Sequence, residues 1–378
     1  MRQFARGVQQ RWEEVWARAN TAAPVVQERH AGVLRDRLFG GGLRMDVQPV
    51  VDLRSGQVVR VEALARLVLD DGSVIPPRQF LPLLGDAELD RVFRLGLDQA
   101  LEQLVAWEAK DLQLDLSVNL APATLLDPDC PAWVGQALRR HGVAPHRLSL
   151  ELLETESIDA ASQDEAIDQL VRLGVKLAMD DLGSGYSSLQ RLSTLPFDTI
   201  KVDQSLTLNL RRDPLLSLSL IRAIIQLGRD LGRQVVVEGL EDAGMVEAAV
   251  ILGAVQGQGY ALARPMRADL LPEWADAFRL DVEAGQVRTF LGALAYHWLH
   301  AQSALPESAV PLKSCPVTRF LDAQGLDDAP VARWHRQCHA EPFDHEASHK
   351  VTAWLVDRVR SESATAGGLP TGAAADRR

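Results

Sequence analysis

The chain has 378 residues, enough for one domain of about 250 residues with appendages or for two or three smaller domains. Its formal net charge of -11 argues against a protein that coats duplex DNA or anionic lipid through a broad basic face. Three cysteines without a dense spacing pattern argue against a disulfide framework, and we find neither an apolar run of about 18 residues nor a signal-peptide pattern. We therefore expect a cytosolic protein with no membrane insertion and no nucleic-acid polymer as its partner.

Residues 1–40 are expected to form an N-terminal helical segment. Val8, Trp12, Val15 and Trp16 lie at spacings that place them on one helical face. We expect this stripe to pack on the next domain or on its own following segment, with a dimer contact as the alternative. The assembly we expect is a homodimer.

Residues 41–280 alternate between short apolar runs and helical patterns. The eight candidate strands are MDVQPVVDL, QVVRVEALARL, LDLSVNLAP, RLSLELLE, VKLAMDD, TIKVD, QVVVEGLE and AVQGQGY. Intervening segments such as 89–110 and 216–232 repeat apolar residues every three or four positions, as amphipathic helices do. This α/β alternation predicts a (β/α)8 barrel of the TIM type. Because the turn LRSGQ at 53–57 resembles a hairpin, we expect one antiparallel strand.

The carboxyl ends of these strands carry polar side chains, at the edge where barrel enzymes place their chemistry. The residues are Glu62, Asn119, Glu151, Asp180 with Asp181, Lys201, Glu238 and Gln258. Five of them are carboxylates, and clustered anions cost free energy unless positive charge compensates them. Oxygen ligands from Asp, Glu and Asn suit Mg²⁺ or Mn²⁺, so the pattern predicts a metal site. Any one of these carboxylates alone would be equally well explained by a salt bridge at a strand end.

Asp180 and Asp181 are adjacent, although neighbouring side chains of a strand point to opposite faces and like charges repel. One carboxylate shared by two ions, with its neighbour bound to one of them, would explain the pair. That is the arrangement used for phosphoryl chemistry, with metals about 3.5 to 4 Å apart.

Seven motifs in order give the chain a specific resemblance to the EAL family of bacterial cyclic di-GMP phosphodiesterases. The family name is spelled by Glu62, Ala63 and Leu64 within VEALAR, and the resemblance runs from QPVVDL at 48 to ARP at 265. It recurs in VNL, ELLE, DDLGSGYSSL, KVD, VEGLE and QGY. It implies a (β/α)8 barrel with one antiparallel strand.

The resemblance also implies roles for individual residues. Two Mg²⁺ or Mn²⁺ ions would be bound by Glu62, Asn119, Glu151, Asp180 and Asp181. The groups implied to act in catalysis are Lys201 on the attacking water, Glu238 as general base or as a ligand through water, and Glu154 tethering the loop after Asp181. The groups implied to act on the substrate and its water network are Gln48, Arg66 and Gln258.

The implied activity is metal-dependent hydrolysis of cyclic di-GMP to linear pGpG. Lys201 would orient the nucleophile, and the leaving group would be the ribose 3′ oxygen. The alternatives are a receptor that binds cyclic di-GMP without turnover and signals through its C-terminal domain, and a metal-dependent barrel acting on another phosphodiester. The receptor alternative rests on three departures from the family pattern, none of them a metal ligand: Leu153, Leu182 and Ser184.

Residues 281–360 are expected to form a mainly helical C-terminal domain with a structural or sensory zinc ion. His345 and His349 would share one helical face, and with Cys315 and either His297 or His300 they would complete a tetrahedral site. Rival ligands are His335, Cys338 and His339. The ordinary alternative is a set of surface and core side chains.

This segment is faintly similar to the chemoreceptor zinc-binding domain. The spacing from the first histidine to Cys315 is short for that family, and the glycine usual after the cysteine is missing. The small, polar residues 361–378 are expected to be a disordered tail.

Overall fold

The computed structural model describes residues 28–153, 160–182, 192, 194–282, 285–302, 310–340 and 343–366. The predicted N-terminal stripe lies outside these ranges. Internal contacts divide the chain into two compact units. The first comprises Met1–Val51, Gln57–Ile200 and Arg264–Phe278, and the second comprises Asp52–Gly56, Lys201–Ala263 and Arg279–Arg378.

The strands form a closed mixed barrel. They are β1 (Leu43–Asp52), β2 (Val58–Val68), β3 (Val74–Ile75), β4 (Asp115–Leu120), β5 (Leu148–Leu153), β6 (Lys176–Leu182), β7 (Thr199–Val202), β8 (Gln234–Val237), β9 (Gln256–Gly257) and β10 (Met266–Arg267). Their hydrogen-bonded order is β10-β1-β9-β8-β7-β6-β5-β4-β2-β3, and β1 also pairs with β2, which closes a ring of eight strands. β1 is antiparallel to β2, whereas β2–β4, β4–β5, β5–β6 and β8–β9 are parallel. The predicted barrel with one antiparallel strand is confirmed.

The reversal between β1 and β2 is built by the turn at 52–56. Asp52 Oδ1 accepts hydrogen bonds from the backbone N–H groups of Arg54 and Ser55, each at 2.9 Å. Gly56 has a positive φ of 70°, and its N–H donates to the Asp52 carbonyl at 2.8 Å. Because glycine adopts this conformation without steric cost, the LRSGQ segment forms the hairpin that its sequence predicts.

The first unit also contains helices, some of which pack directly on its strands. They are α2 (Glu28–Arg37), α3 (Pro77–Phe80), α4 (Asp86–Glu108), α5 (Pro122–Leu125), α6 (Cys130–His141), α7 (Ala160–Arg172) and α12 (Leu271–Ala277). On α4, which matches the helix predicted at 89–110, Leu97, Leu101 and Leu104 are buried at the predicted spacing. Trp107 extends this face, and its indole N–H donates to the Ala268 carbonyl at 3.0 Å.

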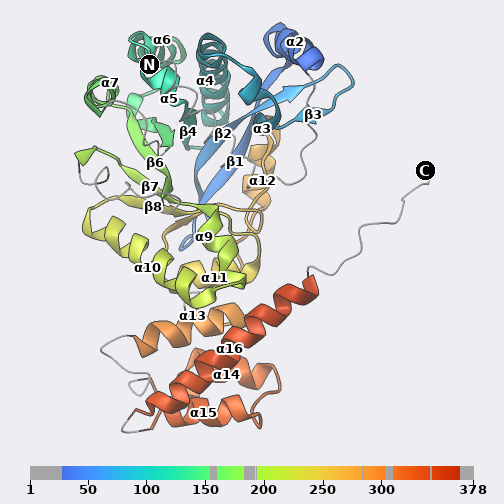
Figure 1. Cartoon of the computed structure of the whole chain (residues 1–378), viewed down its shortest axis with the longest axis vertical. Coiled ribbons are helices and arrows are strands. Elements are labelled where there is room, and N and C mark those ends of the chain that lie inside the picture. The colour runs from blue at the N-terminus through green and yellow to red at the C-terminus, as the bar shows by residue number, and fades with distance from the viewer. Residues whose placement is uncertain are drawn as a thin grey trace, which may run out of the picture. The chain divides into compact units, whose positions relative to one another are not determined.

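The second unit is mainly helical outside its strands. Its helices are α9 (Gln204–Leu208), α10 (Pro214–Asp230), α11 (Ala243–Ile251), α13 (Phe290–Ala301), α14 (Pro316–Ala323), α15 (Pro330–Cys338) and α16 (His345–Ala366). Figure 1 shows α13 to α16 in orange and red as a helical cluster, as expected for the C-terminal extension. α16 continues to Ala366, past Ser361 where we expected a disordered tail to begin, and the Ser361 hydroxyl donates to the Asp357 carbonyl within it. Within the described residues, no helix has the length and apolarity needed to cross a membrane.

Candidate active site

A row of oxygen-bearing side chains lies at the carboxyl ends of β2, β4 and β5. Asn119 donates from Nδ2 to Glu62 Oε1 at 2.8 Å, and the strand register pairs Asn119 with Glu151. Glu62 and Glu151 are buried, with 7% and 2% of their surface exposed. Because the Asn119 contact uses the amide nitrogen, the oxygen Oδ1 is the atom that Asn119 would offer to a cation.

The adjacent aspartates extend this row onto β6. Register pairs Leu153 of β5 with Asp180, whose side chain is buried. Asp181 has a positive φ of 60°, an unusual conformation that Asp tolerates better than most residues. Because Asp181 is not in the extended conformation, its side chain need not point to the opposite face of β6 from that of Asp180. Carboxylate oxygens of the two residues lie within 4.8 Å of each other. The two carboxylates therefore lie close together at the end of β6.

A buried arginine supplies part of the positive charge that this row needs. Arg60 of β2 is buried, and its Nη1 donates to Thr199 Oγ1 at 3.3 Å. Burial lowers the pKa of the Arg60 guanidinium, while the charges of Asp115, Glu151 and Asp198 act to raise it. Since arginine remains protonated in proteins, Glu151 interacts with a permanent cation.

The donor set fits hard divalent cations. Arg60 carries one positive charge, whereas the row carries four carboxylates: Glu62, Glu151, Asp180 and Asp181. Carboxylate and amide oxygens of this kind are the ligands that Mg²⁺ and Mn²⁺ prefer. The buried position of three of these carboxylates strengthens the need for a compensating cation.

In the second unit, the buried Lys201 forms an ion pair with the partly buried Glu238. Lys201 Nζ lies 2.8 Å from Glu238 Oε1, and the two side chains are 4% and 16% exposed. Backbone pairing supports the contact, since the Glu238 N–H donates to the Val202 carbonyl at 3.3 Å. The contact with the carboxylate holds the lysine side chain in one orientation.

Gln258 is fixed by a close backbone crossing. Its N–H donates to the Val237 carbonyl at 2.9 Å, and its carbonyl accepts from the Leu240 N–H at 3.1 Å. A Cβ added at Gly259 would clash with backbone atoms of Leu240, so only glycine permits this approach. The VEGLE and QGY motifs are thus held together by their backbones, and Gln258 is buried there.

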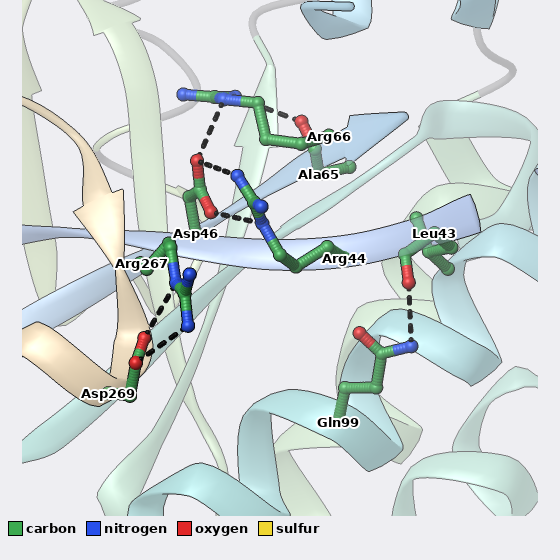
Figure 2. Close-up of polar contacts among 8 residues, drawn as sticks. All are labelled: Leu43, Arg44, Asp46, Ala65, Arg66, Gln99, Arg267 and Asp269. Atoms are coloured by element: carbon green, nitrogen blue, oxygen red, sulfur yellow. Dashed lines mark hydrogen bonds and ion pairs between the residues drawn. The ribbon is translucent and has the colours of Figure 1, made fainter. Parts of the chain in front are cut away.

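The two predicted phosphate-contacting residues lie on β1 and β2. Gln48 is paired in register with Glu62. Figure 2 shows Arg66 and Arg44 sharing one carboxylate, that of Asp46. Arg44 Nε donates to Asp46 Oδ1 at 2.8 Å, and Arg66 Nε lies 3.5 Å from Asp46 Oδ2.

Sequence reasoning did not single out Asp46, Arg44 or Arg60. Arg60 lies an even number of positions from Glu62 and Arg66 on β2. Because alternate residues of a strand point to the same face, this spacing could have predicted that Arg60 shares the face of Glu62. Asp46 and Arg44 give no such signal, because the pairing that places Asp46 near Arg66 is antiparallel and its register is set by the hairpin.

Two expected contributors lie outside the described residues: Glu154 and Ser184. Leu182, another of the three departures, is buried at the end of β6 and anchors that strand end in the apolar core.

The predicted zinc ligands do not gather as expected. His345 and His349 do share one face of α16, but that face is exposed. His297 is buried on α13, where its Nε2 lies 3.1 Å from both the carbonyl and the hydroxyl oxygen of Ser348. The residues that do lie together with Cys315 are the rivals His335 and His339.

Comparison with known proteins gives a match over most of the barrel. A family model described as "EAL domain" matches residues 32–265. An uncharacterized signaling protein of Caulobacter vibrioides is 36% identical over 250 residues, which are 65% of this chain and 30% of that protein. The cyclic di-GMP phosphodiesterase PA2567 of Pseudomonas aeruginosa is 31% identical over 265 residues, 68% of this chain and 45% of that one. The chain thus spans less than half the length of either relative.

Solved structures agree with the architecture. The PaMucR phosphodiesterase in complex with c-di-GMP has a TM-score of 0.61 and 33% sequence identity. The match covers 64% of this chain and 99% of that one. The barrel, rather than the C-terminal helices, therefore carries the likeness.

Proposed function

Because the chain belongs to the EAL domain family, we propose that it hydrolyses cyclic di-GMP to linear pGpG with two Mg²⁺ or Mn²⁺ ions. The observation that carries the proposal is the run of oxygen ligands on the ends of β2, β4, β5 and β6, formed by Glu62, Asn119, Glu151, Asp180 and Asp181. Relatives and neighbours named as cyclic di-GMP phosphodiesterases support the choice of substrate.

The five oxygen ligands would hold the cations. When bound, divalent cations supply Lewis-acid polarisation of a phosphate oxygen and lower the pKa of water. Asn119 keeps its amide oxygen in place by donating from Nδ2 to Glu62, and the positive φ of Asp181 allows two consecutive residues to serve one site.

Lys201 would orient the attacking water, and Glu238 would accept its proton. Lys201 Nζ orients the water and offsets charge that builds on the phosphate in the transition state. Glu238 Oε1, 2.8 Å from that ammonium, holds the lysine in place and is the oxygen that accepts the proton. As the water oxygen bonds to phosphorus, the bond from phosphorus to a ribose 3′ oxygen breaks, and that oxygen takes a proton from solvent to leave as a hydroxyl. The ring is thereby opened.

Substrate contacts would come from β1 and β2. Arg66 provides a planar cation suited to a phosphate, and Gln48 lies opposite Glu62 in register. Gln258 would support the water network, since the backbone crossing at Gly259 fixes its position.

Two variants in the ligand row test the proposal. With Mg²⁺ or Mn²⁺ present, Asp180→Asn and Glu62→Ala should reduce pGpG formation by at least about 10²-fold, because each removes a charge that holds a cation. Removal of divalent cations by a chelator should abolish turnover by the wild type. The matched control is Asp168→Asn on the exposed face of α7, which makes the same chemical change at a surface ion pair with Arg172 and should leave turnover unchanged. Full activity of Glu62→Ala would show that the ligand assignment is wrong.

A further inference from the structure

Three potential metal ligands converge in the C-terminal helices of the second unit. Cys315 precedes α14, His335 lies in α15, and His339 follows α15 directly. Cys315 and His335 are buried, and a ligand atom of each of the three residues lies within 4.8 Å of the others. None of these residues belongs to the barrel chemistry proposed above.

Two of the separations within this cluster are those of a tetrahedral metal centre. His335 Nε2 lies 3.4 Å from Cys315 Sγ and 3.3 Å from His339 Nε2. Zinc binds nitrogen at about 2.0 to 2.1 Å and thiolate sulfur at about 2.3 Å, so tetrahedral angles separate two nitrogens by about 3.3 Å and a nitrogen from a sulfur by about 3.6 Å. Both observed distances are close to these values.

A hydrogen bond at Nδ1 of His339 leaves the other ring nitrogen, Nε2, available as a metal ligand. His339 Nδ1 lies 2.9 Å from the Val310 carbonyl oxygen, which can only accept a hydrogen bond. Nδ1 is therefore the donor of this bond, and the neutral tautomer that it selects carries its lone pair on Nε2, the atom nearest His335. Metal-binding histidines characteristically use a carbonyl in this way to fix the tautomer and the ring orientation.

Hydrogen bonding alone accounts poorly for the surroundings of His335 Nε2. Cys315 Sγ, His339 Nε2 and Thr318 Oγ1 all lie within 3.4 Å of this nitrogen, which carries at most one proton. A cation at the centre of the cluster would use the lone pairs of the thiolate and both imidazoles together.

We propose that Cys315, His335 and His339 bind one Zn²⁺ ion. A thiolate with two imidazoles is a donor set that selects zinc over Mg²⁺ or Mn²⁺, which prefer oxygen. The three side chains leave a fourth position for a solvent ligand, beside the hydroxyl of Thr318. The ion would join the segment before α14 to the end of α15, and so brace the helical cluster.

Metal content of the tag-free, full-length protein tests this site directly. After removal of metals and reloading with Zn²⁺, Cys315→Ser and His339→Gln should each contain about one equivalent less zinc than the wild type. Cys338→Ser, a buried cysteine next to His339, and His349→Gln, an exposed histidine, are the matched controls and should keep the wild-type content. Equal zinc content in wild type and Cys315→Ser would overturn the assignment.

Cobalt substitution separates this site from any metal bound by the barrel carboxylates. Co²⁺ bound by a thiolate gives a sulfur-to-metal charge-transfer band, which oxygen ligands cannot produce. The band should appear in the wild type and in Cys338→Ser and should be lost in Cys315→Ser. Because the wild-type spectrum needs no variant to fold, its lack of such a band would by itself contradict the site.

Discussion

At the scale of single residues, Asp46 is the side chain that positions Arg66. It is buried between Arg44 and Arg66, and Figure 2 shows that its carboxylate serves both guanidinium groups. Loss of its charge would leave Arg66 able to adopt other rotamers, which would weaken the phosphate binding that we propose for Arg66 before it affects the chemical step.

Asp46→Asn should therefore raise KM for cyclic di-GMP about 3- to 10-fold with little change in kcat, the size expected for about 1 kcal/mol of lost orientation. Steady-state kinetics measure the effect. Asp269→Asn is the matched control, because Asp269 forms a similar arginine pair with Arg267 that is exposed. A fall in kcat at unchanged KM would contradict a positioning role for Asp46.

Cys130 is a residue whose protonation depends on packing. It lies at the first position of α6, where a helix N-terminus would favour a thiolate, but burial together with the charges of Asp127 and Asp90 raises its pKa to about 12. Since the folded-state pKa lies above the ordinary value of 9.0, its contribution to stability is complete below pH 9.0 and is lost as the pH rises toward 12.

Cys130 should consequently resist alkylation in the native protein at about pH 8, because only the thiolate reacts. Labelling with iodoacetamide followed by mass spectrometry measures the rate, and the same reaction in denaturant provides the control. A native rate equal to that of the unfolded chain would show that the thiol is neither buried nor held protonated.

At the scale of elements, α11 is tied to α13 by one buried carboxylate. Glu247 accepts hydrogen bonds from the backbone N–H groups of Arg288 and Thr289 at 2.5 and 3.0 Å. Burial raises the pKa of Glu247, although these bonds oppose the shift. A Cβ added at Gly292 would clash with Glu247 Oε2, so the carboxylate can reach its partners only because residue 292 is glycine.

Gly292→Ala should therefore lower the free energy of unfolding by about 1 to 3 kcal/mol, since it displaces a hydrogen-bonded buried carboxylate. Gly32→Ala is the control, because Gly32 lies in helix α2 and a Cβ added there would meet no atom within 4 Å; it should stabilise by about 0.5 to 1 kcal/mol. Denaturant unfolding compares both with the wild type. Stabilisation by Gly292→Ala would contradict the role of this contact.

Periodicity in the sequence predicted the main elements well and the zinc ligands poorly. All eight barrel strands were predicted, because each appears in the sequence as a short apolar run followed by a polar residue at its carboxyl end. β3 and β10 were missed, since two residues are too few to show a period. Spacing placed His345 and His349 on one face of α16, but Val351 and Leu355 occupy its buried face, a choice that only tertiary packing makes.

At the scale of the whole molecule, the candidate site depends on strands that are distant in sequence. The order of the motifs along the chain predicted which residues lie at the carboxyl ends of neighbouring strands. For β4 and β5 the strand register pairs Asn119 directly with Glu151, in agreement with that prediction. The contacts of Asp46 and Arg60 could not be predicted, because they arise from barrel closure and from packing inside it.

The measurement that tests the central claim most directly is a single-turnover reaction of the full-length protein, in excess over cyclic di-GMP, with Mg²⁺ or Mn²⁺. Product is followed by chromatography, and binding is measured on the same preparation. The proposed two-cation site and the Lys201–Glu238 pair predict complete conversion to pGpG. Tight binding of cyclic di-GMP with no product under either metal would contradict the proposal and would identify the protein as a receptor.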